Sequence, residues 1–177
     1  MPHPQQTLIH PKQWHFLVSA LLLCALFSNS GVTWAGVNDS ELRATIVYRL
    51  LQFSSWKGQV PGQTRICVIG SKSLHRELLS ISQHVKKGFD VKQVNVPPPS
   101  SCDIIVAGPK AQKLKLADIQ RKFLICSSCK SEELAAIHLY RFGNKIQFNI
   151  NRKIADTRGI HFKSSVLKAA SKVEAGS

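Results

Sequence analysis

Acidic residues are scarce in this sequence of 177 residues, where 10 Asp and Glu stand against 24 Lys and Arg. Few carboxylates leave few candidates for paired acid–base catalysis. Three common catalytic signatures are also missing: a glycine-flanked serine elbow, two histidines around a glutamate, and a glycine-rich phosphate loop. The histidines beyond residue 35 are scattered and lack the spacing of metal ligands: His75, His84, His138 and His161. We therefore expect a protein that is not an enzyme and that uses neither a metal nor a cofactor.

The sequence has no apolar run long enough to span a bilayer. The longest, residues 16–27, has twelve residues, whereas a membrane-spanning helix needs roughly 20. A weakly positive start with Lys12 precedes this run, and the small residue Ala35 follows it, as in a secretory signal peptide. We predict that residues 1–35 are a signal peptide cleaved after Ala35, and that residues 36–177 form one exported domain. A short retained anchor is the alternative.

Positive charge dominates the expected mature chain. Lys12 is the only basic residue before residue 36, so residues 36–177 carry a formal charge of +13. In a cytoplasmic protein this charge would favour nucleic acid as partner, but export argues against it. The densest basic stretch is interpreted as the solvated face of a helix, with a surface for an acidic partner or anionic lipid as the alternative: Lys110, Lys113, Lys115, Arg121 and Lys122.

Four cysteines remain after the predicted cleavage, and an even number in an oxidising compartment indicates disulfides. Three pairings of Cys67, Cys102, Cys126 and Cys129 are open. Cys67 and Cys102 lie in or beside two predicted core strands, which can be neighbours and bring the two thiols within bonding distance.

Cys126 and Cys129 form a Cys-x-x-Cys motif that follows a predicted strand, where a thioredoxin-type motif would lie. The segment after it, residues 131–134, is able to start a helix, but only a few residues separate it from the next strand. No proline follows in the chain, so the proline loop that thioredoxins place beside their disulfide is missing. A local structural disulfide is therefore favoured, and a thiol–disulfide oxidoreductase using these two cysteines is the alternative.

Apolar periodicity predicts an α/β sandwich of one domain, with a mostly parallel sheet flanked by helices and an antiparallel C-terminal hairpin. A first helix begins at Asp39 or Ser40 and buries a stripe of Leu42, Ile46, Leu50 and Phe53, widened by Val47 and Leu51. Further helices are expected at residues 73–86, 110–120 and 164–173, with a helical turn at 151–155. Strands are expected at residues 65–69, 91–96, 103–107, 123–126, 137–142 and 145–150.

Two segments resemble the YfiR family of small periplasmic proteins. The closing segment is similar to the family's strand ending in Phe-x-Ile-Asn and to its closing helix: Phe148-Asn149-Ile150-Asn151, Gly159-Ile160 and Ser164-Ser165-Val166-Leu167-Lys168-Ala169-Ala170. The opening segment, Arg43-Ala44-Thr45 through Phe53 and Trp56, is similar to the family's first helix. The sequence departs from the family at Arg49, at Lys57, where proline is usual, and at Ala135-Ala136, which replaces a glycine pair.

The resemblance implies a periplasmic inhibitor that docks on a membrane-bound diguanylate cyclase and restrains cyclic-di-GMP signalling and biofilm formation. Redox state or an outer-membrane lipoprotein would relieve the restraint, and the family suggests homodimers. The resemblance also assigns Cys67–Cys102 as the main cross-link or switch and Cys126–Cys129 as a second, local bridge.

Two further candidate sites come from the residues themselves. His161 and Lys163 point the same way if their segment is extended, and so form a candidate contact for an anionic ligand or a partner. An ordinary exposed basic pair is the alternative interpretation. A small-ligand site at the carboxyl ends of the strands is a third hypothesis for the function, because open α/β sheets bind ligands there.

Overall fold

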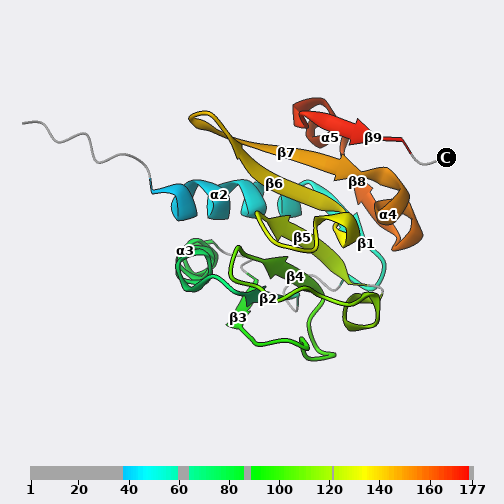
Figure 1. Ribbon diagram of the computed structural model, residues 1–177. Coiled ribbons are helices and arrows are strands. Elements are labelled where there is room, and N and C mark those ends of the chain that lie inside the picture. Colours follow the sequence, from blue (N-terminus) through cyan, green and yellow to red (C-terminus); the bar gives the residue numbers. More distant parts are fainter. Residues whose placement is uncertain (1–37, 60–63, 86–88, 121, 176–177) are drawn as a thin grey trace, which may run out of the picture. The chain divides into compact units, whose positions relative to one another are not determined.

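The computed structural model describes residues 38–59, 64–85, 89–120 and 122–175 (Figure 1). The predicted signal peptide lies outside these residues. Within them, no helix is both long and apolar enough to cross a membrane. The helices are α2 (Asp39–Gln52), α3 (Lys72–Gln83), α4 (Arg152–Thr157), α5 (Ser164–Ala169) and the 3-10 turns η1 (Leu116–Ile119) and η2 (Glu132–Leu134). The strands are β1 (Ser54–Trp56), β2 (Arg65–Ile69), β3 (Asp90–Gln93), β4 (Ile104–Ala107), β5 (Phe123–Ser127), β6 (Ile137–Phe142), β7 (Lys145–Asn151), β8 (Ile160–Phe162) and β9 (Lys172–Glu174).

A seven-stranded sheet in the order β3-β2-β4-β5-β6-β7-β9 organises the fold. Every neighbouring pair is parallel except β6 and β7, which form the predicted hairpin around Gly143 at φ +56°. The predicted α/β class with a mostly parallel sheet is therefore confirmed. Two features were not predicted: β9 extends the sheet beyond the hairpin, and β1 pairs with β8 in a separate two-stranded sheet.

One face of the large sheet, here called the helix face, packs against α-helices (Figure 1). Alternate strand residues such as Val68, Val106 and Ile125 meet Leu51 of α2 and Leu78 of α3, all of them buried. The remaining short elements α4, β8 and α5 contribute to the same core through one buried residue each: Ala155, Ile160 and Val166.

The buried stripe of α2 differs from the one predicted. The buried residues are Ser40, Arg43, Ala44, Val47, Tyr48, Leu50 and Leu51. Leu42 and Ile46 are half-buried and Phe53 is exposed. The helix is therefore rotated so that part of the predicted stripe faces outward.

The opposite face, here called the loop face, holds the intervening strand residues, including Ile105 and Leu124. Irregular segments cover it, through residues such as Ala111, Leu114 and Ile119. All four cysteines beyond residue 36 also lie in this second cluster.

The predicted helix at 110–120 is wrong, because tertiary hydrogen bonds hold this segment in an irregular conformation. The Lys110 amide donates to Gly70 O at 3.1 Å, and the Leu114 amide donates to Ser131 Oγ at 2.8 Å. Gly70, at φ +68°, permits this close approach, since a Cβ there would lie 2.0 Å from Ala111 N. Only the single 3-10 turn η1 forms, so Lys110, Lys113 and Lys115 do not share a helix face; Arg121 lies outside the described residues.

Helix ends also differ slightly from prediction. Asn38 and Ser71 are the N-caps of α2 and α3, one or two residues before the predicted positions, and their side chains accept from Ser40 N and Leu74 N. The closing helix ends at Ala169 rather than near residue 173, because the Ser171 amide donates to Phe148 O and the chain joins the sheet as β9. Strand β3 ends at Gln93, short of the predicted residue 96.

Candidate functional site

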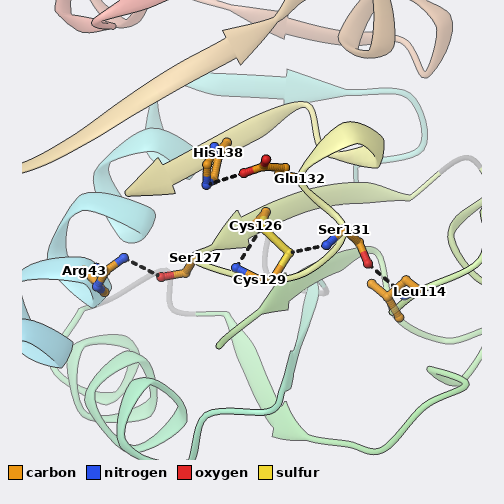
Figure 2. Close-up of a disulfide and its surroundings, with 8 residues drawn as sticks. All are labelled: Arg43, Leu114, Cys126, Ser127, Cys129, Ser131, Glu132 and His138. Carbon is orange, nitrogen blue, oxygen red and sulfur yellow. Dashed lines mark hydrogen bonds and ion pairs between the residues drawn. A yellow bond between two sulfur atoms is a disulfide. The ribbon is translucent and has the colours of Figure 1, made fainter. Parts of the chain in front are cut away.

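The Cys-x-x-Cys segment begins inside β5, at Cys126, and ends in the loop after it. Its two sulfurs are bonded, with Cα atoms 5.3 Å apart (Figure 2). The amide of Cys129 donates to Cys126 Sγ at 3.0 Å, and the amide of Ser131 donates to Cys129 Sγ at 3.3 Å. Ser128, between the two cysteines, has a φ of +56°, a conformation that few residues other than glycine adopt. Its amide donates to Leu139 O. The loop is therefore folded tightly around its own disulfide.

Neighbouring segments hold this loop in place (Figure 2). Ser131, 1% exposed, accepts a hydrogen bond from the Leu114 amide and so ties the loop to the segment that covers the loop face. Beyond it, His138 Nε2 lies 3.1 Å from Glu132 Oε2. At the other end of the loop, Arg43 of α2 donates from Nη1 to Ser127 Oγ at 3.2 Å.

This geometry does not favour disulfide exchange. Cys126 is fully buried and Cys129 is 9% exposed, so an attacking thiolate has little access to either sulfur. The segment expected to start a helix forms only the three-residue turn η2, so no α-helix begins beside the two sulfurs as in thioredoxin-type motifs. The bond has the position of a structural cross-link.

The second disulfide joins Cys67, inside β2, to Cys102, just before β4, with Cα atoms 5.8 Å apart. Both residues are buried, and the bond closes a sequence separation of 35. The parallel pairing of β2 with β4 brings them together, because Cys67 lies opposite Ile105 in the register.

Among the described residues, no three His, Cys, Asp or Glu side chains gather to hold a metal ion.

The structure places His161 and Lys163 beside the end of α2. His161 lies in β8 opposite Ser55 of β1, and is exposed. Lys163 follows β8, and its ammonium lies 5.4 Å from the ring centroid of Phe53, within cation–π distance. Lys163 thus borders an aromatic surface that was not predicted.

That surface is an apolar groove of about 350 Å³ between α2, β7 and α5. Phe53, 38% exposed, and Phe148 contribute aromatic rings, and Ile46 and Ala169 contribute aliphatic surface. Arg49 also lines the groove. The signal was present in the sequence, because α2 carries more apolar residues than one buried stripe can accommodate.

Asp39, in the first turn of α2, forms ion pairs with two arginines. Burial raises the pKa of this carboxyl, but hydrogen bonds from Arg43 and Arg141, with their positive charges, outweigh that effect. The pKa of Asp39 is therefore below its usual value. The Arg43 Nε–Asp39 Oδ2 distance is 2.6 Å, and Arg141 of β6 contacts the other oxygen.

Comparison with known proteins places the chain in a family. The sequence matches the family described as YfiR/HmsC-like over residues 40–171, and the protein belongs to that family. Membership assigns the protein in general terms to a family of periplasmic proteins whose role is regulatory rather than catalytic.

Other comparisons give less. No curated protein matches the sequence. A solved structure, the ABC domain in complex with L-Trp from Streptococcus pneumonia, is 16% identical with a TM-score of 0.49. The alignment covers 76% of this chain and spans only 60% of that one, and a likeness this distant carries no argument about function.

Proposed function

We propose that this protein binds the periplasmic domain of a membrane-bound diguanylate cyclase and restrains cyclic-di-GMP synthesis without catalysing a reaction itself. The observation that carries the proposal is the family match over residues 40–171. The buried disulfides support a binding role, because neither offers an accessible sulfur for turnover.

The apolar groove is the docking surface in this proposal. Exposed apolar surface that is concave and bordered by charge is typical of protein interaction sites. Arg49 and Lys163 give this groove a positive border, so the complementary partner surface is apolar with acidic residues around it. His161 is exposed two residues before Lys163, and we include it as a candidate rim contact.

The proposal extends to assembly and release. In this proposal the protein forms homodimers. An outer-membrane lipoprotein, or a change in the redox state of the disulfides, releases the cyclase from its restraint. The two disulfides lie in the loop face, so reduction would act on docking by loosening that face rather than by exposing a catalytic thiol.

A binding assay with two charge reversals tests the docking surface. The purified periplasmic domain of the cyclase encoded beside this gene is immobilised, and binding of the oxidised protein is measured by interferometry. Arg49→Glu should weaken binding by about tenfold or more, because it reverses the charge on the groove. Lys153→Glu makes the same charge change on an exposed residue of α4 and should leave binding within about twofold.

The outcomes separate the function from the surface. If neither the oxidised nor the reduced wild-type protein binds the cyclase domain, the proposed function is wrong. If the wild type binds and both variants bind equally well, the function stands and the groove is not the docking surface.

A further inference from the structure

Strand β7 has a partly free edge beside the apolar groove. The strand spans Lys145–Asn151, but β9 pairs only with its last part, from Asn149 to Asn151. In Figure 1 the first part of β7 extends toward the tip of the hairpin, beyond the start of β9. Residues 145–148 therefore pair with β6 on one side and with no strand of the described chain on the other.

Hydrogen bonds around Leu139 and Phe148 indicate which backbone groups of β7 point away from β6. These two residues lie opposite one another in the hairpin. Leu139 O accepts from the Ser128 amide, just after β5, and Phe148 O accepts from the Ser171 amide, just before β9. The two residues are therefore a pair that exchanges no backbone hydrogen bonds. Because such pairs alternate along an antiparallel ladder, Ile146 also directs its N–H and C=O away from β6.

Three backbone groups on this edge are open to a partner. They are the N–H and the C=O of Ile146 and the N–H of Phe148, which form none of the backbone hydrogen bonds outside the ladders of the described chain. A row of unpaired backbone groups on a strand edge is a template for another strand. Partner proteins use such edges by adding an extended segment to the sheet.

The free edge adjoins the apolar groove. Phe148 lines the groove from β7, and Ile46 and Arg49 line it from α2. Ile146 and Phe148 both pack against the core of the helix face, so the groove lies on that side of the edge. Successive side chains of a strand point to opposite faces of the sheet, so a strand added along β7 would direct every second side chain toward the groove.

Charges beside the edge favour an acidic partner over a second copy of this chain. Lys145 is exposed and forms none of the ion pairs among the described residues. Arg49 is the one charged side chain among the described residues that line the groove. Two copies joined along this edge would bring the cations of both together, which is unfavourable, whereas acidic residues of a partner would complement them.

We propose that the partner adds an extended segment to the sheet as a further strand along residues 145–148 of β7. This inference rests on the docking role proposed above and specifies its geometry. The backbone of the segment bonds to the N–H and C=O of Ile146 and to the N–H of Phe148. Apolar side chains at alternate positions enter the groove, and acidic side chains lie near Lys145 and Arg49.

Hydrogen exchange followed by NMR tests the added strand. The oxidised, ¹⁵N-labelled protein is measured alone and with an excess of the periplasmic domain of the cyclase encoded beside this gene. Exchange at the amides of Ile146 and Phe148 should slow by about tenfold or more in the complex, because each amide gains an acceptor.

The amide of Gln93 is the internal control for this measurement. The amides of Asp90 and Val94 donate to Thr64 O and Val68 O of the segment that contains β2. Because amide directions alternate along a strand, the Gln93 amide points away from β2, at the other free edge of the sheet. Its exchange rate should change by less than about twofold when the cyclase domain binds.

A proline at each free edge gives a matched pair of variants. Proline lacks the N–H and is tolerated on an edge strand where that N–H faces solvent. Ile146→Pro should weaken binding to the immobilised cyclase domain by about tenfold or more, whereas Gln93→Pro should leave it within about twofold. Urea denaturation establishes that both variants fold. Lys145→Glu leaves the backbone intact and should also weaken binding, by about threefold or more.

The outcomes distinguish this inference from the proposed function. If the cyclase domain binds but exchange at Ile146 and Phe148 is unchanged, the added strand is wrong and the proposed function stands. If the wild type does not bind, both are wrong. Slow exchange at these amides in the free protein that depends on its concentration would mean that the edge pairs with a second copy, which also contradicts the inference.

Discussion

The two faces of the central sheet are built by different means. On the helix face, α2 and α3 satisfy their own backbone hydrogen bonds and contribute large aliphatic side chains such as Leu51 and Leu78. On the loop face, the covering segments are irregular, and their backbone relies on side-chain acceptors such as Ser131 Oγ. Both disulfides lie on that second face.

The difference shows what is required when irregular segments, and not helices, cover a face of a sheet. A helix contributes its backbone hydrogen bonds wherever it packs, whereas an irregular segment loses chain entropy with fewer bonds in return. Cross-links reduce the entropy of the unfolded chain and so offset part of that cost. We therefore expect the loop face to depend on oxidation and the helix face to depend on packing alone.

The largest expected effect is loss of the disulfide between β2 and the segment before β4. Replacing Cys67 and Cys102 together by alanine should lower the free energy of unfolding by roughly 3–4 kcal/mol, because the bond closes a separation of 35 residues. Urea denaturation of the oxidised proteins measures this loss.

Leu78→Ala on the helix face is the matched control. It should cost about 2–5 kcal/mol through the cavity that it leaves, and the same amount in the oxidised and the reduced protein. If the double cysteine variant is as stable as the wild type, or if the cost of Leu78→Ala depends on reduction, the two faces are not independent.

A smaller effect is expected from the local disulfide after β5. Replacing Cys126 and Cys129 by alanine should cost about 2 kcal/mol, because the closed loop spans a separation of only 3 residues. Hydrogen exchange should accelerate at the amides of Cys129 and Ser131, which donate to the two sulfurs. A stability loss greater than that of the first pair would mean that this loop, and not the longer cross-link, holds the loop face.

The smallest effect concerns the ion pairs at the start of α2, on the helix face. The folded pKa of Asp39 is lowered, so its contribution to stability is present above the unfolded pKa of about 3.9 and is lost as pH falls through the folded pKa. Asp39→Asn should therefore cost up to about 1 kcal/mol at neutral pH, a value limited by the 41% exposure of the carboxylate, and this cost should shrink as the pH falls below the unfolded pKa.

Thermal unfolding across this pH range measures the effect of Asp39→Asn. Asp156→Asn is the comparison, because this exposed carboxylate of α4 makes none of the ion pairs among the described residues. A constant gap between wild type and Asp39→Asn at every pH would contradict the electrostatic explanation.

Prediction from sequence succeeded where local pattern and tertiary environment agree. The alternating residues of β6 and β7 and the glycine between them predicted the hairpin, and the helical turn predicted at 151–155 is found as α4, with Asn151 as its N-cap. Prediction failed at residues 110–120, where the basic stretch was interpreted as one face of a helix, but the distant acceptors Gly70 O and Ser131 Oγ bind the backbone instead. The strand β9 was missed because its three exposed residues carry no burial pattern.

The candidate sites were less predictable than the fold. Arg43 appeared only as part of a helix motif, since neither its burial nor its hydrogen bond to Ser127 can be inferred without knowing that β5 ends beside α2. Phe53 was assigned to the core, because helical spacing gives an apolar stripe without showing which side of it faces the sheet.

By itself the sequence determined the α/β class, the hairpin and the resemblance to YfiR-like proteins, since these depend on short-range patterns of apolar, turn and motif residues. Only the tertiary structure decided that helices cover one face of the sheet and cross-linked loops the other. It also decided which side of α2 is buried and which side chains meet at the carboxyl ends of β2, β4 and β5. Those features depend on contacts between residues far apart in the chain, for which local spacing contains no information.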